Sequence, residues 1–277
     1  MHDIIRSYRK RLYDLFDFAK EKTMEKKETI IRTEKLSKSF SVGGKQHHII
    51  KNLDLEIYKG DFTVIMGSSG AGKSTLLYSL SGMDKPSLGR IVYCGQDITD
   101  KSNDALAVFR RKHCGFVFQQ IHLVDSMSIM DNVISTGMLT GQKQKDLKQK
   151  AMDLFERVGI GEDLTGKFPA QLSGGEAQRA AIVRALINEP DIVFADEPTG
   201  ALNSAGVKAV LDVLTDVNNA GQSVVMVTHD IKSARRANRV IYLQDGGVMG
   251  ECDLGRYVSG DKKRHEKIRG FLEEMGW

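Results

Sequence analysis

Apolar residues recur at helical spacing at both ends of the chain. In residues 1–28 they fall every three or four positions and form one stripe, which predicts an amphipathic helix followed by a charged linker. The stripe consists of Ile4, Ile5, Tyr8, Leu12, Leu15, Phe16 and Ala19. In residues 256–277 the positions Ile268, Leu272 and Met275 have similar spacing. We therefore expect a second amphipathic helix at the C-terminal end.

The pattern between the two ends alternates short apolar strands with helices. Strands alternating with helices predict a parallel sheet with helices on its faces, so the main domain, residues 29–255, is expected to be α/β. Residues from about 102 to 172 are mostly helical in pattern and form a distinct region within it. Strand patterns cover residues 30–36, 53–57, 62–66, 89–98, 192–195, 223–227 and 240–243, and helical patterns cover residues 146–158, 176–187 and 205–217.

Composition excludes several classes of protein. Apolar residues make up 41% of the 277 residues and charged residues 27%, as in a folded globular protein. No run of 18 apolar residues occurs, so we expect no membrane-spanning helix. The three cysteines, Cys94, Cys114 and Cys252, lack the spacing of a zinc site and indicate reduced cytosolic thiols.

The net charge of +4 is contributed by the two ends, because residues 29–255 carry equal numbers of basic and acidic side chains. A neutral main domain argues against a broad nucleic-acid-binding face, and we expect no nucleic-acid partner. Basic ends are compatible with an anionic surface, and we expect at least one of them to lie against the inner leaflet or a membrane partner. The alternative is a pair of solvated helices of slightly unequal charge.

A glycine-rich loop gives the first indication of chemistry. Residues 67–75 match the pattern GxxxxGK[ST], after a buried apolar run and at the start of a helix. Such a loop turns successive N–H groups toward a phosphate at the helix N-terminus. Lys73 can reach the β- and γ-phosphates, and the Ser74 hydroxyl can ligate Mg²⁺. The candidate ATP-binding residues here are Gly67, Ser68, Ser69, Gly70, Ala71, Gly72, Lys73, Ser74 and Thr75.

Two adjacent carboxylates follow the apolar strand of residues 192–195. Asp196 and Glu197 stand at its carboxyl end, which in a parallel sheet faces the ligand crevice. We expect Asp196 to hold Mg²⁺, directly or through water. Glu197 is expected to orient or deprotonate the water that attacks the γ-phosphate.

A second phosphate-binding helix end is predicted in the segment Leu-Ser-Gly-Gly-Glu-Ala-Gln-Arg of residues 172–179. It lies about a hundred residues after the first, and it has no lysine or magnesium ligand of its own. One interpretation is that it serves the nucleotide held by another copy of the chain. The other is an ordinary helix start with a serine N-cap.

The order and spacing of these motifs, together with Gln119 and His229, resemble those of the ATP-binding-cassette (ABC) ATPases over residues 30–250. The resemblance implies an α/β P-loop NTPase fold, with a RecA-like core, an antiparallel β subdomain and a helical subdomain at about residues 102–172. It also implies ATP and Mg²⁺ as cofactors.

Residue roles follow from the same resemblance. Gln119 resembles the glutamine that touches Mg²⁺ and couples to the membrane partner, and His229 the histidine that contacts the γ-phosphate. Phe40 is similar to the aromatic residue that stacks on adenine. The catalytic set is thus Glu197, His229, Gln119 and Lys73, and the metal set is Ser74, Gln119 and Asp196. Ser173, Gly174 and Gly175 would complete the ATP site of the opposite subunit.

One residue departs from the pattern of the family. Asn203 stands where the family usually has an aspartate, which puts any role of a carboxylate there in doubt. The form Gly-Ala-Leu-Asn-Ser of residues 200–204 is similar to that of the bacitracin-type branch. The wider sequence, with residues 116–120, 131–133 and 168–173, resembles the group of lipoprotein-release, macrolide-export and antimicrobial-peptide ATPases.

The resemblance implies an ATP-hydrolysing transporter subunit that forms a homodimer around two ATP molecules. It would be peripheral at the cytoplasmic face of the cell membrane, bound to a separate permease. Export or detoxification of antimicrobial peptides or antibiotics is the expected role, with lipoprotein release or cell-division-type force transmission as the alternative. Other classes left open are an iron–sulfur-assembly ATPase without a transporter, a translation- or repair-type protein acting on nucleic acid, and a binding module without catalysis.

Overall fold

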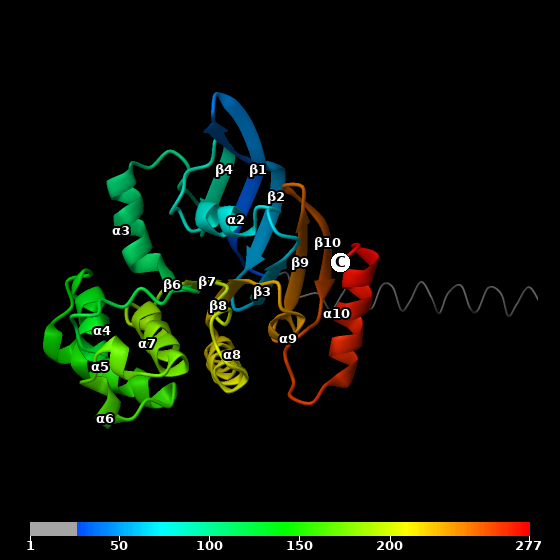
Figure 1. The fold of residues 1–277 in the computed structure, drawn as a ribbon. Helices are drawn as coiled ribbons and strands as arrows, with labels where there is room; N and C mark the ends of the chain where they lie inside the picture. Colours follow the sequence, from blue (N-terminus) through cyan, green and yellow to red (C-terminus); the bar gives the residue numbers. More distant parts are fainter. Residues whose placement is uncertain (1–26) are drawn as a thin grey trace, which may run out of the picture.

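The computed structural model describes residues 27–277 (Figure 1). The amphipathic helix expected in residues 1–28 lies outside the described residues, apart from Lys27 and Glu28, which precede the first strand. No helix within the described part of the chain is long and apolar enough to cross a bilayer.

A six-stranded sheet forms the centre of the molecule, in the order β10-β9-β3-β8-β7-β6. All its neighbouring pairs are parallel except β10, which is antiparallel to β9. The parallel strands are almost fully buried, as expected for strands covered on both faces. Their bounds are β3 (Phe62–Met66), β6 (Cys114–Phe118), β7 (Ile192–Asp196), β8 (Ser223–Val227), β9 (Arg239–Gln244) and β10 (Gly247–Asp253).

An antiparallel sheet of order β2-β1-β4-β5 lies over one face of the central sheet (Figure 1). Its long hairpin turns at Gly43 and Gly44, which have φ angles of 58° and 78°, as a tight hairpin turn requires. The strands are β1 (Thr29–Val42), β2 (Lys45–Tyr58), β4 (Leu88–Tyr93) and β5 (Gln96–Asp97).

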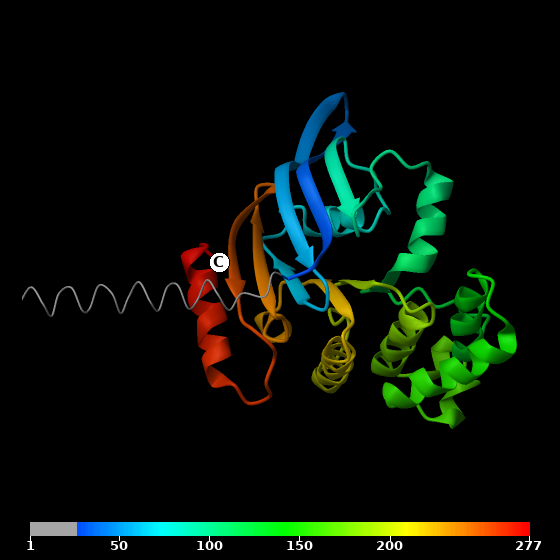
Figure 2. The same cartoon turned by 180° about the vertical axis from the view of Figure 1, so that it is seen from behind.

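The helices divide between the two faces and one end of the molecule. α2 lies between the two sheets, α8 lies on the opposite face, and α4, α5 and α6 form a cluster beside α7 (Figures 1 and 2). The bounds are α2 (Lys73–Leu80), α3 (Asn103–His113), α4 (Ile129–Met138), α5 (Gln144–Arg157), α6 (Glu162–Thr165), α7 (Gly174–Leu186), α8 (Ser204–Asn219), α9 (Ile231–Ala234) and α10 (Lys262–Glu274).

The alternation of side chains along β3 divides the interior into two hydrophobic cores. Ile65 packs in the core between the sheets, together with Leu76 and Leu77 of α2. Val64 and Met66 point to the other face, where α7 and α8 pack. The carboxyl ends of the parallel strands are thus held between two cores, next to the loop that opens α2.

The C-terminal helix packs its apolar stripe against the domain itself. Ile268 and Leu272 of α10 are buried in the second core, and Phe271 and Met275 contact Gly250 of β10. Figures 1 and 2 both show α10 alongside β10. The apolar face of this helix is therefore covered by its own domain. That at least one of the two ends lies against the inner leaflet or a membrane partner stays a prediction.

The structure confirms the α/β class, with an antiparallel sheet beside the parallel one. β1 and β2 are longer than the predicted strands, because their outer halves are exposed and carry polar residues that hide the alternation. β10 was not predicted at all. Its residues are only partly buried at the edge of the sheet, so its sequence shows no period of two.

Candidate nucleotide site

The loop of residues 67–72 has a backbone that only glycine adopts without strain. Gly67, Gly70 and Gly72 have φ angles of 153°, 80° and 94°. A Cβ on Gly67 would lie 2.1 Å from the carbonyl oxygen of Leu243, and a Cβ on Gly72 would lie 2.9 Å from Ile50. The glycines therefore let the loop pass between β9 and β2.

The N-terminus of α2 is left open by this loop. Its N-cap residue is Gly72, no side chain caps it, and its first turn carries no acidic residue. The free N–H groups and the helix dipole thus favour an anion at this end. Lys73 donates from Nζ to the carbonyl oxygens of Gly67 and Ser68, at 2.9 and 2.8 Å. Burial lowers the pKa of Lys73, and Glu197 and Asp196 oppose this shift.

Asp196 is held by two hydroxyl groups of α2. Ser74 donates to Oδ1 at 3.0 Å and Tyr78 donates to Oδ2 at 2.7 Å. Burial, followed by the hydrogen bond to Asp196, raises the pKa of Tyr78 to about 12. Tyr78 was missed by the sequence analysis, although it stands four residues after Ser74 and so lies on the same face of a helix.

Glu197 and His229 form a pair next to Asp196. Glu197 has a φ of 45°, a left-handed conformation that is uncommon outside glycine, and its N–H donates to the carbonyl of Val227 at 3.0 Å. Its Oε1 lies 2.8 Å from Nδ1 of His229. The His229 side chain is 69% exposed and the Glu197 side chain 17%, so the imidazole projects outward while the carboxylate lies in the site.

Gln119 follows β6 and lies beside the loop after Glu197. A Cβ on Gly200 would lie 2.8 Å from Nε2 of Gln119, so the two segments are in close contact. The N–H of Gly200 donates to the carbonyl of Glu197 at 3.0 Å. The structure thus brings together the phosphate loop, Asp196, Glu197, His229 and Gln119 at the carboxyl edge of the sheet.

Phe40 lies on β1, in the sheet that flanks the loop. It pairs with His47 of β2, two residues before Ile49, whose side chain contacts the position of Gly72. The ring is 41% exposed, and the ammonium of Lys38 lies 4.9 Å from its centroid. Lys38 also donates to Asp84 at 2.5 Å, which fixes its ammonium over the ring. This cation–π contact, which the sequence analysis did not single out, holds the Phe40 ring in position.

The second helix end, at α7, is a capping box. The hydroxyl of Ser173 accepts from the N–H of Glu176 at 3.3 Å, and Glu176 accepts from the N–H and the hydroxyl of Ser173 at 2.8 and 2.7 Å. These hydrogen bonds lower the pKa of Glu176. Among residues 27–277, no hydrogen bond or ion pair joins Ser173, Gly174 or Gly175 to the phosphate loop, Asp196 or Glu197. The structure therefore does not bring residues 172–179, called the signature segment below, into this chain's own site.

The signature segment contacts the start of α8 instead. A Cβ on Gly174 would lie 3.2 Å from Leu202, and one on Gly175 would lie 3.2 Å from Gly206. Asn203 is the N-cap of α8, and its side chain accepts from the N–H of Gly206 at 2.9 Å. An amide oxygen does this as well as a carboxylate would, which explains how Asn203 fits this position.

Gln178 of α7 connects the two regions. Its side chain is 1% exposed and donates to the carbonyl of Phe118 at 2.9 Å, directly before Gln119. Arg184 of the same helix donates to the carbonyl of Ile121 at 2.9 Å. Helix α7 therefore holds the segment that carries Gln119. The sequence pattern did not reveal these contacts.

The residues present fit a nucleotide with a magnesium ion. The open helix N-terminus and Lys73 offer donors to phosphate oxygens. Ser74 and Asp196, whose oxygens lie 3.0 Å apart, offer the hard oxygen ligands that Mg²⁺ takes alongside phosphates and water. The fold and this site define a P-loop nucleoside triphosphatase with an added antiparallel sheet and a helical region.

Comparison with known proteins narrows this class. A family model described as "ABC transporter" matches residues 50–200. The lipoprotein-releasing system ATP-binding protein LolD of Aquifex aeolicus is 40% identical over 222 residues, covering 80% of this chain and 97% of LolD. The macrolide export ATP-binding/permease protein MacB 2 of Yersinia pestis is 39% identical over 222 residues, and the chain spans 33% of its length.

A solved structure has the same fold. It is the dimeric post-hydrolysis state of the ATP-binding cassette MJ0796 bound to ADP and Pi, with a TM-score of 0.75 and 35% identity over 82% of this chain and 100% of that one. The chain belongs to the ABC transporter family, and it is an ATP-binding subunit of the type that hydrolyses ATP.

Proposed function

We propose that Glu197 is the general base for ATP hydrolysis and that Lys73, His229 and Gln119 assist it. Glu197 directly follows β7 and its carboxylate bonds to His229, which supports a role in orienting the attacking water. Lys73 neutralises charge on the β- and γ-phosphates. Ser74, Asp196 and Gln119 would hold Mg²⁺, which when bound neutralises charge on the phosphate oxygens. Phe40 stacks on the adenine.

The variant Glu197→Gln tests the base. It keeps the shape of the side chain and removes the carboxylate, so turnover should fall by about 100-fold or more while ATP affinity changes little. A matched control is Glu189→Gln, which alters a distant exposed carboxylate that pairs with Lys150. Turnover at the wild-type rate in Glu197→Gln would remove Glu197 from the mechanism.

The chain acts as a head-to-tail homodimer in this proposal, with each ATP between the phosphate loop of one copy and Ser173, Gly174 and Gly175 of the other. The observation that carries it is the exposed helix end of α7, which lies against Leu202 and Gly206 and forms no hydrogen bond or ion pair with the nucleotide site of the same chain within residues 27–277. The dimeric state of the related cassette MJ0796 supports the same arrangement.

A membrane permease is the second partner in this proposal, which makes the protein peripheral at the cytoplasmic face of the cell membrane. A groove of about 440 Å³ lies between α3 and α4 and includes Phe118, next to Gln119. Met83 and Leu139 line it and are 41% and 58% exposed. A groove that touches the Gln119 segment and carries exposed apolar side chains next to Arg110 and Arg111 is suited to an amphipathic segment of a permease.

Copurification tests the permease partner. Leu139→Asp should abolish recovery of an integral membrane protein with the tagged chain, while Leu88→Asp should not, because Leu88 is 72% exposed and outside the groove. Recovery of no membrane protein with the wild-type chain would favour the alternative of an ABC ATPase without a transporter, such as the iron–sulfur-assembly type.

Export or detoxification of antimicrobial peptides or antibiotics is the substrate class we propose, on the form of residues 200–204 and the similarity to the macrolide exporter MacB 2. Lipoprotein release or force transmission is the second candidate, favoured by the similarity to LolD over nearly its full length. Loss of the gene should lower resistance to a bacitracin-type peptide in the first case. In the second it should leave resistance unchanged and retain lipoproteins in the inner membrane.

A further inference from the structure

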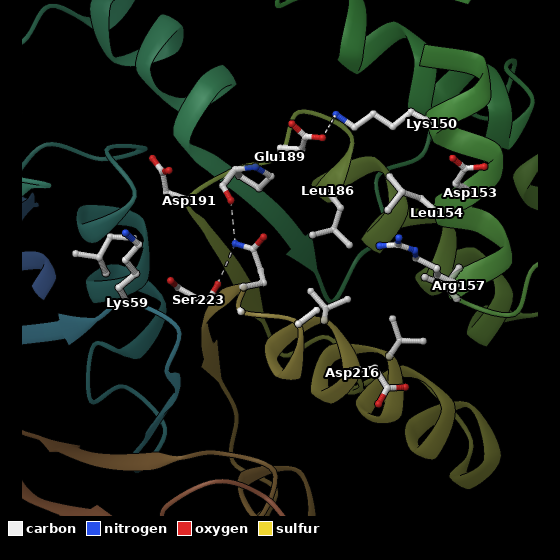
Figure 3. Close-up of a pocket in the computed structure, with 18 of the residues that line it drawn as sticks. Lys59, Lys150, Asp153, Leu154, Arg157, Leu186, Glu189, Asp191, Asp216 and Ser223 are labelled. Atoms are coloured by element: carbon white, nitrogen blue, oxygen red, sulfur yellow. Dashed lines mark hydrogen bonds and ion pairs between the residues drawn. The ribbon is translucent and has the colours of Figure 1, made fainter. Parts of the chain in front are cut away.

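A cavity of about 750 Å³, drawn in Figure 3, lies at the amino ends of the parallel strands, opposite the edge of the sheet that carries the nucleotide site. Asp191 and Ser223 line it at the amino ends of β7 and β8, whereas Asp196 and Glu197 follow the carboxyl end of β7. None of its lining residues takes part in the proposed nucleotide chemistry. The volume lies in the range of cavities that bind organic ligands or several side chains.

The walls of this cavity come from two parts of the fold. Leu154 and Arg157 of α5 form one side, and Val213 and Val217 of α8 form the other. Leu154, Val213 and Val217 thus give the interior an apolar part, next to the longer side chain of Arg157. Two carboxylates, Asp153 on α5 and Asp216 on α8, are exposed at its edge, and neither forms an ion pair within residues 27–277. The lining also carries Lys59 and Lys150, which pair with Glu28 and Glu189, and Arg157, which forms no ion pair in the described part of the chain. Two unpaired carboxylates against one unpaired guanidinium leave the lining net acidic, so the cavity suits an apolar ligand with positive charge on its flanks.

The described chain begins at the rim of this cavity. Glu28 pairs with Lys59 at 3.1 Å, and the backbone N–H of Lys59 donates to the carbonyl of Glu28 at 2.8 Å. Lys27 pairs with Asp61 at 2.8 Å. Lys59 and Ile30 both line the cavity, so the segment that precedes residue 27 is tethered directly beside it.

The sequence of that segment complements the cavity. Its apolar stripe, centred on Leu12 and Leu15, would lie between Arg9 and Arg11 on a helical projection. A helix over residues 4–19 would be about 24 Å long at 1.5 Å per residue. The seven residues that link it to Lys27 can span up to about 25 Å, which is enough for the helix to fold back onto the cavity.

We propose that residues 1–26 of the same chain dock into this cavity as an amphipathic helix. The apolar stripe fills the space between α5 and α8, and the flanking arginines meet Asp153 and Asp216. The tether at Lys27 and Glu28 makes this an intramolecular contact at high effective concentration, which favours the chain's own segment over a second copy. The docked segment would join the helical region to the core on the side away from the nucleotide.

Cys94 provides a direct readout, because it lines the cavity and is exposed, whereas Cys114 and Cys252 are buried. The test is the rate of maleimide alkylation of Cys94 in the full-length chain, followed by mass spectrometry. The double variant Leu12→Ser, Leu15→Ser should alkylate about fivefold to tenfold faster than the wild type, since a site covered about 90% of the time reacts about tenfold slower. The matched control Lys10→Ser, Asp17→Ser changes the opposite face without changing net charge, and should alkylate at the wild-type rate.

A second measurement uses disulfide formation between the proposed helix and Cys94. Leu12→Cys should form a disulfide with Cys94 under mild oxidation, in a monomer and at a rate independent of protein concentration, while Lys10→Cys should do so much more slowly. Equal rates for the two variants, or equal alkylation in wild type and the stripe variant, would overturn the proposal. A disulfide-linked dimer would also overturn it, because the occupant would then be a second copy of the chain. So would binding of the wild-type chain to anionic phosphatidylglycerol vesicles through residues 1–26, if Cys94 in that chain reacts as fast as it does in the stripe variant.

Discussion

Replacing Tyr78 by phenylalanine removes one hydroxyl from the nucleotide site and leaves the ring in place. That hydroxyl donates to Oδ2 of Asp196 at 2.7 Å, while Ser74 donates to Oδ1 at 3.0 Å. In the proposed site Ser74 would become a magnesium ligand when nucleotide binds, and Tyr78 would then be the remaining side chain of α2 that fixes the carboxylate. We therefore expect Tyr78 to position Asp196 without touching the nucleotide.

The size of the effect follows from the hydrogen bond that is lost. A hydrogen bond to a charged group contributes about 1.5–3 kcal/mol, and loss of a residue that orients a metal ligand weakens metal binding about 10–100-fold. We expect the Mg²⁺ concentration for half-maximal ATPase activity to rise about tenfold in Tyr78→Phe, which corresponds to about 1.4 kcal/mol. The maximal rate at saturating Mg²⁺ and the affinity for ATP in EDTA should stay close to the wild-type values.

The assay is a magnesium titration of steady-state ATPase activity, beside binding of a fluorescent ATP analogue in EDTA. The control variant is Tyr93→Phe, whose hydroxyl donates to the carbonyl of His113 in a different part of the molecule. An unchanged magnesium midpoint in Tyr78→Phe would refute the positioning role. So would a fall in maximal rate that extra Mg²⁺ cannot restore.

Three further predictions concern stability. The pKa of Tyr78 is raised from 10.0 to about 12, so the unfolded chain loses this proton at a lower pH than the folded chain does. The stability that Tyr78 contributes is therefore present below pH 10 and is lost as the pH rises toward 12. Urea unfolding should show a steeper fall of the free energy of unfolding between pH 10 and 12 in wild type than in Tyr78→Phe. Arg264 is 4% exposed and donates to five backbone carbonyls, those of Arg235, Ala237, Leu254, Gly255 and Arg256. Arg264→Met should therefore lower the free energy of unfolding by about 3 kcal/mol or more, against about 0.5 kcal/mol for Arg269→Ala at an exposed position. Equal losses in the two variants would contradict the anchoring of α10 by Arg264. Asn203→Ala should cost about 1 kcal/mol by the loss of the cap on α8, whereas Asn203→Asp should cost little; equal unfolding midpoints for the two would contradict the capping role.

Local patterns with a strict physical requirement were predictable from the sequence. The strands β3, β7 and β8 were placed within a residue of their ends, because strands buried on both faces are short apolar runs. The glycines of residues 67–72 were predicted because the loop needs φ angles that only glycine adopts easily. The order of strands in the sheet was not derivable from these patterns, because pairing is set by contacts far apart in sequence.

Contacts across elements were the part that sequence could not supply. The bonds from Tyr78 to Asp196 and from Gln178 to Phe118 join residues 118 and 60 positions apart. The C-terminal stripe of Ile268 and Leu272 was recognised as apolar, but periodicity cannot say which surface covers it. The structure shows that it is the second core of the same domain.

The central claim is that ATP is held between two copies of the chain, and ATP-dependent dimerisation tests it most directly. Molar mass by light scattering is measured for Glu197→Gln with ATP and Mg²⁺, beside Glu197→Gln combined with Ser173→Arg, which places a bulky cation at the exposed α7 end. The account predicts that Glu197→Gln forms a stable dimer with ATP but not with ADP. It predicts that the combined variant stays monomeric and still binds ATP. A Glu197→Gln protein that stays monomeric with ATP bound, at every concentration and beside a fully active wild-type monomer, would contradict it.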